Sequence, residues 1–213
     1  SEATAKEIAV KELKAQIERD LAAAEPALVK ASAALDSLNK KDLGELKTMS
    51  KPPAGVDDVT AAVIYMLHDG SKGKIDVSWK AAKLVMGDIN KFLDTLLNYK
   101  QRIDDGLVPK QNFKNLAPLL EQEHFTADVM RNKSTAAAGL CEFVININVY
   151  WNINENVEPM RMKAAEANAE LESAIAAKDA ALAKKAEAES IVAELTAQFD
   201  AAVKEKDDVM AEA

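Results

Sequence analysis

All seven glycines of this 213-residue sequence lie between Gly44 and Gly139, and nine of its ten aromatic residues lie between Tyr65 and Trp151. The segments on either side are rich in alanine, glutamate, lysine and leucine, a composition typical of long helices because these residues favour the helical backbone. The central segment holds the turn residues and large side chains of a compact globule. The sequence therefore predicts two helical arms on either side of a globular centre.

The apolar residues of the two arms follow the spacing of a coiled coil. In the first arm the heptad spacing is interrupted once, between Ile17 and Leu21. The stripe of this arm consists of Val10, Leu13, Ile17, Leu21, Ala24, Leu28, Ala31, Leu35 and Leu38. The stripe of the last arm consists of Leu171, Ile175, Leu182, Val192, Leu195, Phe199 and Val203. Alanine fills much of the seam and buries little area, so the predicted pairing is weak. Two amphipathic helices of an ordinary bundle are the alternative.

Two prolines mark the predicted boundaries of the arms. Pro26 interrupts the helical pattern of the first arm and Pro159 lies at the start of the last, and a proline removes one helical hydrogen bond. We therefore expect an all-α fold, an antiparallel coiled-coil hairpin capped by a small globular bundle of short helices. The expected segments are a first arm at 1–25, a globular tip at 26–159 and a second arm at 160–213.

The two prolines also predict which residues of the arms lie opposite one another. Aligning the arms from Pro26 and Pro159 sets Val10 opposite Ile175 and Ala3 opposite Leu182. This alignment leaves the end of the second arm without a partner in the chain. We expect its apolar stripe to pack against a neighbouring molecule.

Between the prolines the pattern predicts short helices joined by turns. The first, Leu35–Met49, continues the first arm and stops before Pro52, since the residue before a proline avoids helical angles. Asp57 or Asp58 is expected to cap the next helix. The remaining helices are expected at 56–67, 79–86, 91–99, 112–122 and 126–132, followed by a long apolar helix that Ser134 caps and that runs through Trp151 into the second arm. Loops are expected at 69–74 and 102–109.

Composition and cysteine content limit the class of protein. With 48% hydrophobic and 29% charged residues, the sequence fits a soluble protein and excludes a disordered chain. It contains no apolar run long enough to cross a bilayer, and no signal peptide opens it. The single cysteine excludes an internal disulfide and fits a reducing compartment such as the cytoplasm.

The sequence offers no candidate for a catalytic or metal site. Cys141 lies in an apolar run, which favours a buried thiol over a nucleophile. His68 and His124 lack cysteine or carboxylate neighbours at the spacing of metal ligands. The segment Gly70–Lys74 lacks the spacing of a phosphate-binding loop. We therefore expect a non-catalytic chain that binds no cofactor or metal of its own.

Basic residues gather at two places in the globular centre although the formal net charge is −8. The clusters are Lys40, Lys41, Lys47 and Lys51 before the Pro-Pro stop, and Arg131 and Lys133 before the last long helix. In an antiparallel hairpin both clusters belong to the tip, and such a patch favours docking on an acidic polymer surface. The alternative is an ordinary solvated lysine face. The overall acidity argues against nucleic acid as a partner, and no feature indicates a membrane.

Three stretches carry a family resemblance. Residues 35–53 read LDSLNKKDLGELKTMSKPP, residues 78–83 read SWKAAK and precede Phe92-Leu93, and residues 134–141 read STAAAGLC, with Val157-Glu158-Pro159 beyond. They resemble the first, middle and last helices of the microtubule-binding domain of dynein heavy chains, and its return into the stalk. The last stretch is closer to axonemal than to cytoplasmic dyneins, and WKAAK is closer to outer-arm chains.

The resemblance implies which residues bind tubulin. Basic residues of the family's first helix match Lys40, Lys41 and Lys47, and a middle-helix arginine matches Lys83, which keeps the charge but loses the planar fork. The arginine before the last helix aligns with Asn132, so Arg131 or Lys133 is expected to replace it. The expected microtubule-binding set is Lys40, Lys41, Lys47, Lys51, Lys83, Arg131 and Lys133, with Pro26 and Pro159 at the junction of stalk and tip.

The resemblance also implies a larger protein around this chain. The parent would be an ATP-driven motor, with ATP and magnesium bound in a ring outside this fragment, and would work in the axoneme of a cilium or flagellum. Some outer-arm chains bind a leucine-rich-repeat light chain at this tip, which makes such a chain a candidate partner.

The weak seam predicts a way to control binding. An alanine-rich seam with an interrupted heptad has several registers of similar energy, and a slip of one helical turn is about 5.4 Å. We expect the register to set the angle of the tip helices and thus the fit of their lysines to tubulin. The alternative function is a structural coiled-coil hairpin that binds a protein partner. An enzyme is the third class considered, and no residues support it.

Overall fold

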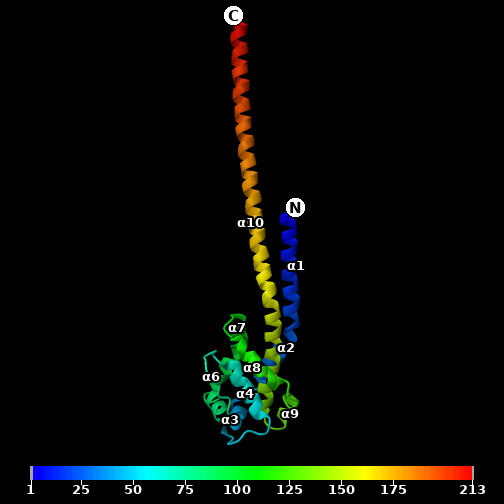
Figure 1. Ribbon diagram of the computed structural model, residues 1–213, viewed down its shortest axis with the longest axis vertical. Helices are drawn as coiled ribbons and strands as arrows, with labels where there is room; N and C mark the ends of the chain where they lie inside the picture. The colour runs from blue at the N-terminus through cyan, green and yellow to red at the C-terminus, as the bar shows by residue number, and fades with distance from the viewer. Residues whose placement is uncertain (1, 213) are drawn as a thin grey trace. The chain divides into compact units, whose positions relative to one another are not determined.

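A computed structural model describes residues 2–212 and shows ten α-helices and no strand within them (Figure 1). In chain order the helices are α1 (Glu2–Ala23), α2 (Glu25–Ser37), α3 (Lys40–Thr48), α4 (Val56–Leu67), α5 (Trp79–Val85), α6 (Ile89–Leu97), α7 (Tyr99–Asp104), α8 (Lys110–Leu120), α9 (Ala127–Arg131) and α10 (Thr135–Glu212). The predicted all-α class is confirmed. Across the described residues no helix is both long and apolar enough to cross a membrane.

The contacts divide the chain into two units. The globular unit is Ile17–Pro159, and the arm unit combines residues 2–16 with residues 160–212. Pro26 lies in the first turn of α2, where its missing N–H breaks no helical hydrogen bond. Pro159 lies inside α10, which continues past it. The three segments that the two prolines delimit remain a prediction.

The arm unit pairs α1 with the second part of α10, side by side and antiparallel (Figure 1). The ammonium of Lys6 lies 3.8 Å from the carboxylate of Glu170, and Val10 is buried. The predicted pairs of Val10 with Ile175 and of Ala3 with Leu182 are wrong, since Ile175 is 45% and Leu182 53% exposed. A seam of small alanines packs similarly in several registers, so the apolar pattern alone does not select one.

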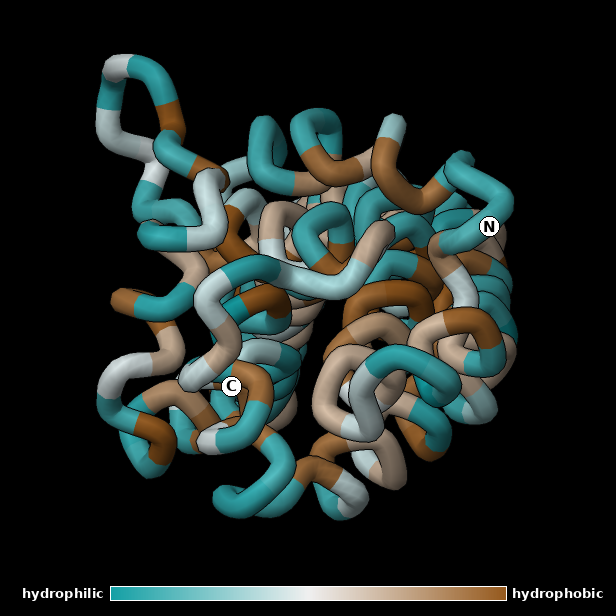
Figure 2. The backbone as a smooth tube through the Cα atoms, turned by 90° about the horizontal axis from the view of Figure 1, so that it is seen from below, coloured by the Kyte–Doolittle hydropathy of each residue, from teal (hydrophilic) through white to brown (hydrophobic). Residues whose placement is uncertain are grey.

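The core of the globular unit collects side chains from most of its helices. Helix α4 is buried along most of its length and packs against α5 and α8. The ring of Phe113 in α8 stacks on Trp151 of α10, with centroids 4.3 Å apart and planes 5° apart. Coloured by hydropathy, the helices of this unit show hydrophobic segments alternating with hydrophilic turns (Figure 2). This alternation gives each helix one face for the core and one for solvent.

The predicted continuous helix Leu35–Met49 is wrong, because the chain leaves the helical conformation at Leu38 and Asn39. The side chain of Asn39 accepts a hydrogen bond of 2.7 Å from the backbone N–H of Asp42 and so caps a new helix, α3. Asparagine is among the best residues for this position. The break allows the axis of α3 to differ from the axis of α2.

Two further predictions of helix ends need correction. The helix at 56–67 is confirmed as α4, but Gly55, with a φ of +87°, stands at its N-cap in place of Asp57 or Asp58. Both aspartates lie in the first turn, where their charge interacts favourably with the helix dipole. The expected loop at 102–109 begins later, because α7 extends to Asp104 and the buried ring of Tyr99 anchors it.

Asn112 ties α8 to the end of α4. It is 1% exposed, and its amide donates hydrogen bonds to the carbonyl oxygens of Met66 (3.1 Å) and His68 (2.7 Å). The Met66 carbonyl also accepts a bond of 2.6 Å from the hydroxyl of Tyr99.

We expect Asn112→Leu to lower the free energy of unfolding by about 2 kcal/mol, because the hydrogen bonds of its buried amide to the carbonyl oxygens of Met66 and His68 are lost. Urea denaturation followed by circular dichroism measures this change. The neighbouring exposed Gln111→Leu is the control and should change stability by less than about 0.5 kcal/mol. Equal stability of the two variants would contradict the role given to Asn112.

Candidate functional site

Helix α3 carries three of the seven candidate residues. Leu43 and Leu46 are fully buried and fix the rotation of the helix about its axis. Lys40 and Lys47, seven residues apart, therefore lie two turns from one another along one side of α3. Lys41 is exposed on a different side of the same helix.

Two hydrogen bonds attach α5 to the end of α3. The indole Nε1 of Trp79 donates to the backbone carbonyl of Met49 at 2.9 Å. The ammonium of Lys47 donates to the backbone carbonyl of Gly87, just beyond α5, also at 2.9 Å. The second bond uses a neutral carbonyl, so the positive charge of Lys47 is retained. The structure thus brings the cations of α3 beside those of α5.

Helix α5 turns its lysines away from the core. Ser78 caps it by accepting a hydrogen bond of 3.2 Å from the backbone N–H of Ala81. Ala82 and Met86, each 2% exposed, face the core, and on a helix this places the exposed Lys80 on the outer side and the half-buried Lys83 at its flank. Lys83 was predicted as a candidate, whereas Lys80 was missed. Its spacing of three residues from Lys83 was the signal that could have identified it.

Two of the remaining three candidates lie at the turn between α3 and α4, and the third lies in α9. Lys51 is exposed in this turn. The ammonium of Lys133, between α9 and α10, donates a hydrogen bond to the carbonyl of Ala54 in the same turn. Arg131 forms an ion pair of 2.7 Å with Asp128 within α9, which offsets part of its charge. Lys51 and Lys133 thus lie at the same turn, and Arg131 lies two residues before Lys133 in the chain.

His124 packs against the turn between α3 and α4 and against the start of α4. Its Nε2 lies 2.5 Å from a carboxylate oxygen of Asp58, and its ring lies against Gly55, where an added Cβ would come within 2.8 Å of the ring. Gly55 also has a φ of +87°, so a side chain there would be both strained and crowded. His124 therefore has a structural role. Over the described part of the chain, no group of three His, Cys, Asp or Glu residues could hold a metal ion.

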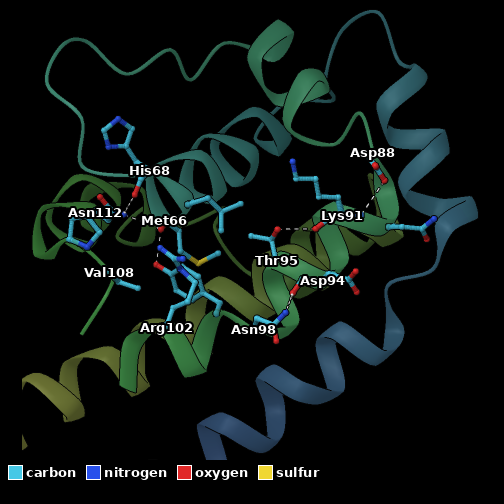
Figure 3. A pocket seen from close by; sticks show the side chains of 14 residues that line it. Met66, His68, Asp88, Lys91, Asp94, Thr95, Asn98, Arg102, Val108 and Asn112 are labelled. Atoms are coloured by element: carbon cyan, nitrogen blue, oxygen red, sulfur yellow. Dashed lines mark hydrogen bonds between the residues drawn. The ribbon is translucent and has the colours of Figure 1, made fainter. Parts of the chain in front are cut away.

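A cavity of about 690 Å³ lies elsewhere in the globular unit, between the end of α4, α6, α7 and residues 108–112 (Figure 3). Its lining mixes the cations Lys91 and Arg102 with the carboxylates of Asp88 and Asp94. The seven candidate residues all lie outside it. The cavity therefore does not contribute to the basic surface.

We call the face formed by α3 and α5 the cationic surface. It consists of Lys40, Lys47, Lys80 and Lys83. Within residues 2–212, none of Lys40, Lys41, Lys51 and Lys83 forms an ion pair. These ammonium groups can therefore pair with carboxylates of a partner, which is the chemistry that this arrangement offers.

The family model of the microtubule-binding stalk of dynein motors matches residues 2–213. The chain belongs to this dynein stalk family. It is 46% identical over 161 residues to the "Dynein alpha chain, flagellar outer arm" of Chlamydomonas reinhardtii, a match that covers 76% of this chain and 4% of that protein. It is 41% identical over 204 residues to "Dynein axonemal heavy chain 11" of Sus scrofa, covering 95% of this chain and 4% of that protein. The dynein stalk thus spans about 4% of the length of these curated relatives.

A solved structure agrees with this assignment. The "Microtubule Binding Domain of DYNEIN-C" is similar to this chain with a TM-score of 0.53 and 32% identity, covering 67% of this chain and 94% of that one. The predicted resemblance to axonemal dynein heavy chains is confirmed. As a dynein stalk domain, the chain is a non-catalytic part of the motor.

Cys141 of the dynein stalk is fully buried in α10, and desolvation by this burial raises the pKa of its thiol to about 12, with the charge of Glu142 acting in the same direction. A thiol reacts with alkylating reagents as the thiolate. We expect iodoacetamide at pH 8 to leave the native domain unlabelled and to label it fully in urea. Mass spectrometry measures the labelled fraction. Rapid labelling of the native domain would contradict the burial of this thiol.

Proposed function

We propose that this dynein stalk binds the tubulin surface of a microtubule through the basic residues of its globular unit. The residues are Lys40, Lys41, Lys47, Lys51, Lys80, Lys83, Arg131 and Lys133. The observation that carries the proposal is the attachment of α5 to α3 by the bonds of Trp79 and Lys47, since it joins cations of two helices into one surface.

The charges support binding to an acidic polymer. Exposed ammonium groups without an internal carboxylate partner attract acidic surfaces over roughly one Debye length, about 8 Å at physiological ionic strength. Such steering raises the association rate and is lost as salt screens it.

The double variant Lys40→Glu with Lys47→Glu tests this surface. We expect it to abolish co-sedimentation with polymerised tubulin while the helix content measured by circular dichroism stays unchanged, because two attractive charges become repulsive and the bond of Lys47 to the Gly87 carbonyl is lost. The matched control is Lys30→Glu with Lys114→Glu, which reverses two exposed charges on α2 and α8. The control should pellet like the unchanged domain.

Three results would count against the proposal. Salt-sensitive binding by the Lys40→Glu, Lys47→Glu variant would move the interface to another face. Equal loss in the control would show that only net charge matters. If the unchanged domain does not pellet at all, the remaining function is that of a coiled-coil hairpin that binds another protein.

We further propose that the register of the arms sets the affinity for tubulin. Helix α10 runs without a break from Thr135 in the globular unit to Glu212 in the arm unit. An added Cβ at Gly139 of α10 would lie 2.8 Å from Leu38, which immediately precedes the cap of α3. An axial shift of α10 would therefore displace Leu38 and the start of α3. Because the registers of an alanine-rich seam are close in energy, a few kcal/mol supplied at either end of the stalk is enough to select one.

Disulfide crosslinks can hold two registers for comparison. In a Cys141→Ala background, Lys6→Cys with Glu170→Cys fixes the register of the structure, and Lys6→Cys with Ala174→Cys fixes one shifted by about one turn. We expect the two oxidised proteins to differ at least tenfold in dissociation constant for microtubules, and to bind alike once reduced. Equal affinities in the oxidised state would contradict control by register.

The relatives guide the proposals for the parent protein. We place it in the axoneme of a cilium or flagellum, supported by the names of its flagellar and axonemal relatives. We assign ATP and magnesium to a motor ring outside this chain. A leucine-rich-repeat light chain is a further proposed partner of the tip, supported by the similarity to an outer-arm heavy chain.

A further inference from the structure

Helix α5 exposes a large apolar side chain next to its lysines. Leu84 is 74% exposed and its neighbour Val85 is 38% exposed. The core-facing positions of α5 are occupied by Ala82 and Met86. Leu84, two residues after Ala82, is on the opposite side of the helix.

Helical geometry places Leu84 within the cationic surface. With about 100° between successive residues, positions 80, 83, 84 and 87 fall within an arc of roughly 100° on the outer side of α5. Leu84 therefore shares this face with Lys80 and Lys83. Position 87, one turn after Lys83, is a glycine, so it has no side chain to cover Leu84. The backbone carbonyl of Gly87 accepts the hydrogen bond from the ammonium of Lys47.

We infer that Leu84 packs against an apolar spot on tubulin when the cationic surface docks. This inference rests on the proposed function. Two features favour tubulin as the occupant: the face is continuous with the proposed interface, and the surrounding lysines attract an acidic partner to this side of α5. A partner held by those lysines covers Leu84 at the same time.

The division of roles follows from the chemistry of the two residue types. Lysines at the rim steer association and make it sensitive to salt, whereas an apolar side chain covered at the centre slows dissociation. The free energy from burying apolar area depends little on ionic strength in the range that screens surface charges. Leu84 therefore supplies a component of affinity that salt does not remove.

The test compares dissociation constants for microtubules across a series of salt concentrations. Leu84→Asn, which keeps the shape but adds polarity, should weaken binding about tenfold at every salt concentration and leave the slope against salt unchanged. Lys83→Ala should instead reduce the slope. Because Leu84 is 74% exposed, its replacement should leave the urea midpoint unchanged, which separates a lost contact from a lost fold.

The matched control is Leu107→Asn. Leu107 is 57% exposed just after α7, which lies on the far side of the globular unit from α3 (Figure 1), and its replacement should leave binding unchanged. If Leu84→Asn binds like the unchanged domain while Lys40→Glu with Lys47→Glu does not bind, the inference is overturned and the proposed function stands. Equal weakening by Leu107→Asn also overturns it. Failure of the unchanged domain to pellet overturns both.

Discussion

The cationic surface depends on the attachment of α5 to the end of α3. Helix α5 contains only seven residues, too few to be stable by itself in water, so its position is set by what holds it. The core contacts of Ala82 and Met86 fix its inner face, and the bonds from Trp79 to Met49 and from Lys47 to Gly87 fix its position against α3. Lys47 both holds α5 against α3 and contributes a positive charge to the surface. Its charge is retained because the acceptor of its hydrogen bond is a neutral carbonyl.

A second constraint connects this surface with the rest of the chain. Gly139 allows α10 to approach Leu38 closely at the break between α2 and α3. The stack of Phe113 on Trp151 attaches α8 to α10 farther along. Both contacts involve α10, a single helix of 78 residues. Within the globular unit these contacts hold α10 against the break that precedes α3 and against α8.

The sequence predicted most helices of the globular unit because strong local signals mark their ends. Ser134 caps α10 as expected, with its hydroxyl accepting from the backbone N–H of Ala137 at 3.1 Å, and Val56–Leu67 is a helix as expected. The prediction failed at Asn39, where a residue that is tolerated inside a helix acts as a cap. It failed again at α7, whose place depends on the burial of Tyr99. In the candidate site it predicted Lys47 and Lys83, which stay predictions, and the structure adds Lys80 on the same helix as Lys83.

The sequence by itself determined the all-α class, the two arms, the absence of candidate catalytic residues and the resemblance to dynein stalks. These depend on helix propensity, apolar spacing and short motifs, all of which are local properties of the chain. Only the tertiary structure decided that α3 and α5 share one surface, that Leu84 is exposed within it, and that Lys6 pairs with Glu170. The bond between Lys47 and Gly87 joins residues 40 positions apart, and the pairing of the arms selects among registers of similar energy. Such contacts follow from how the whole core and seam pack, which no local pattern specifies.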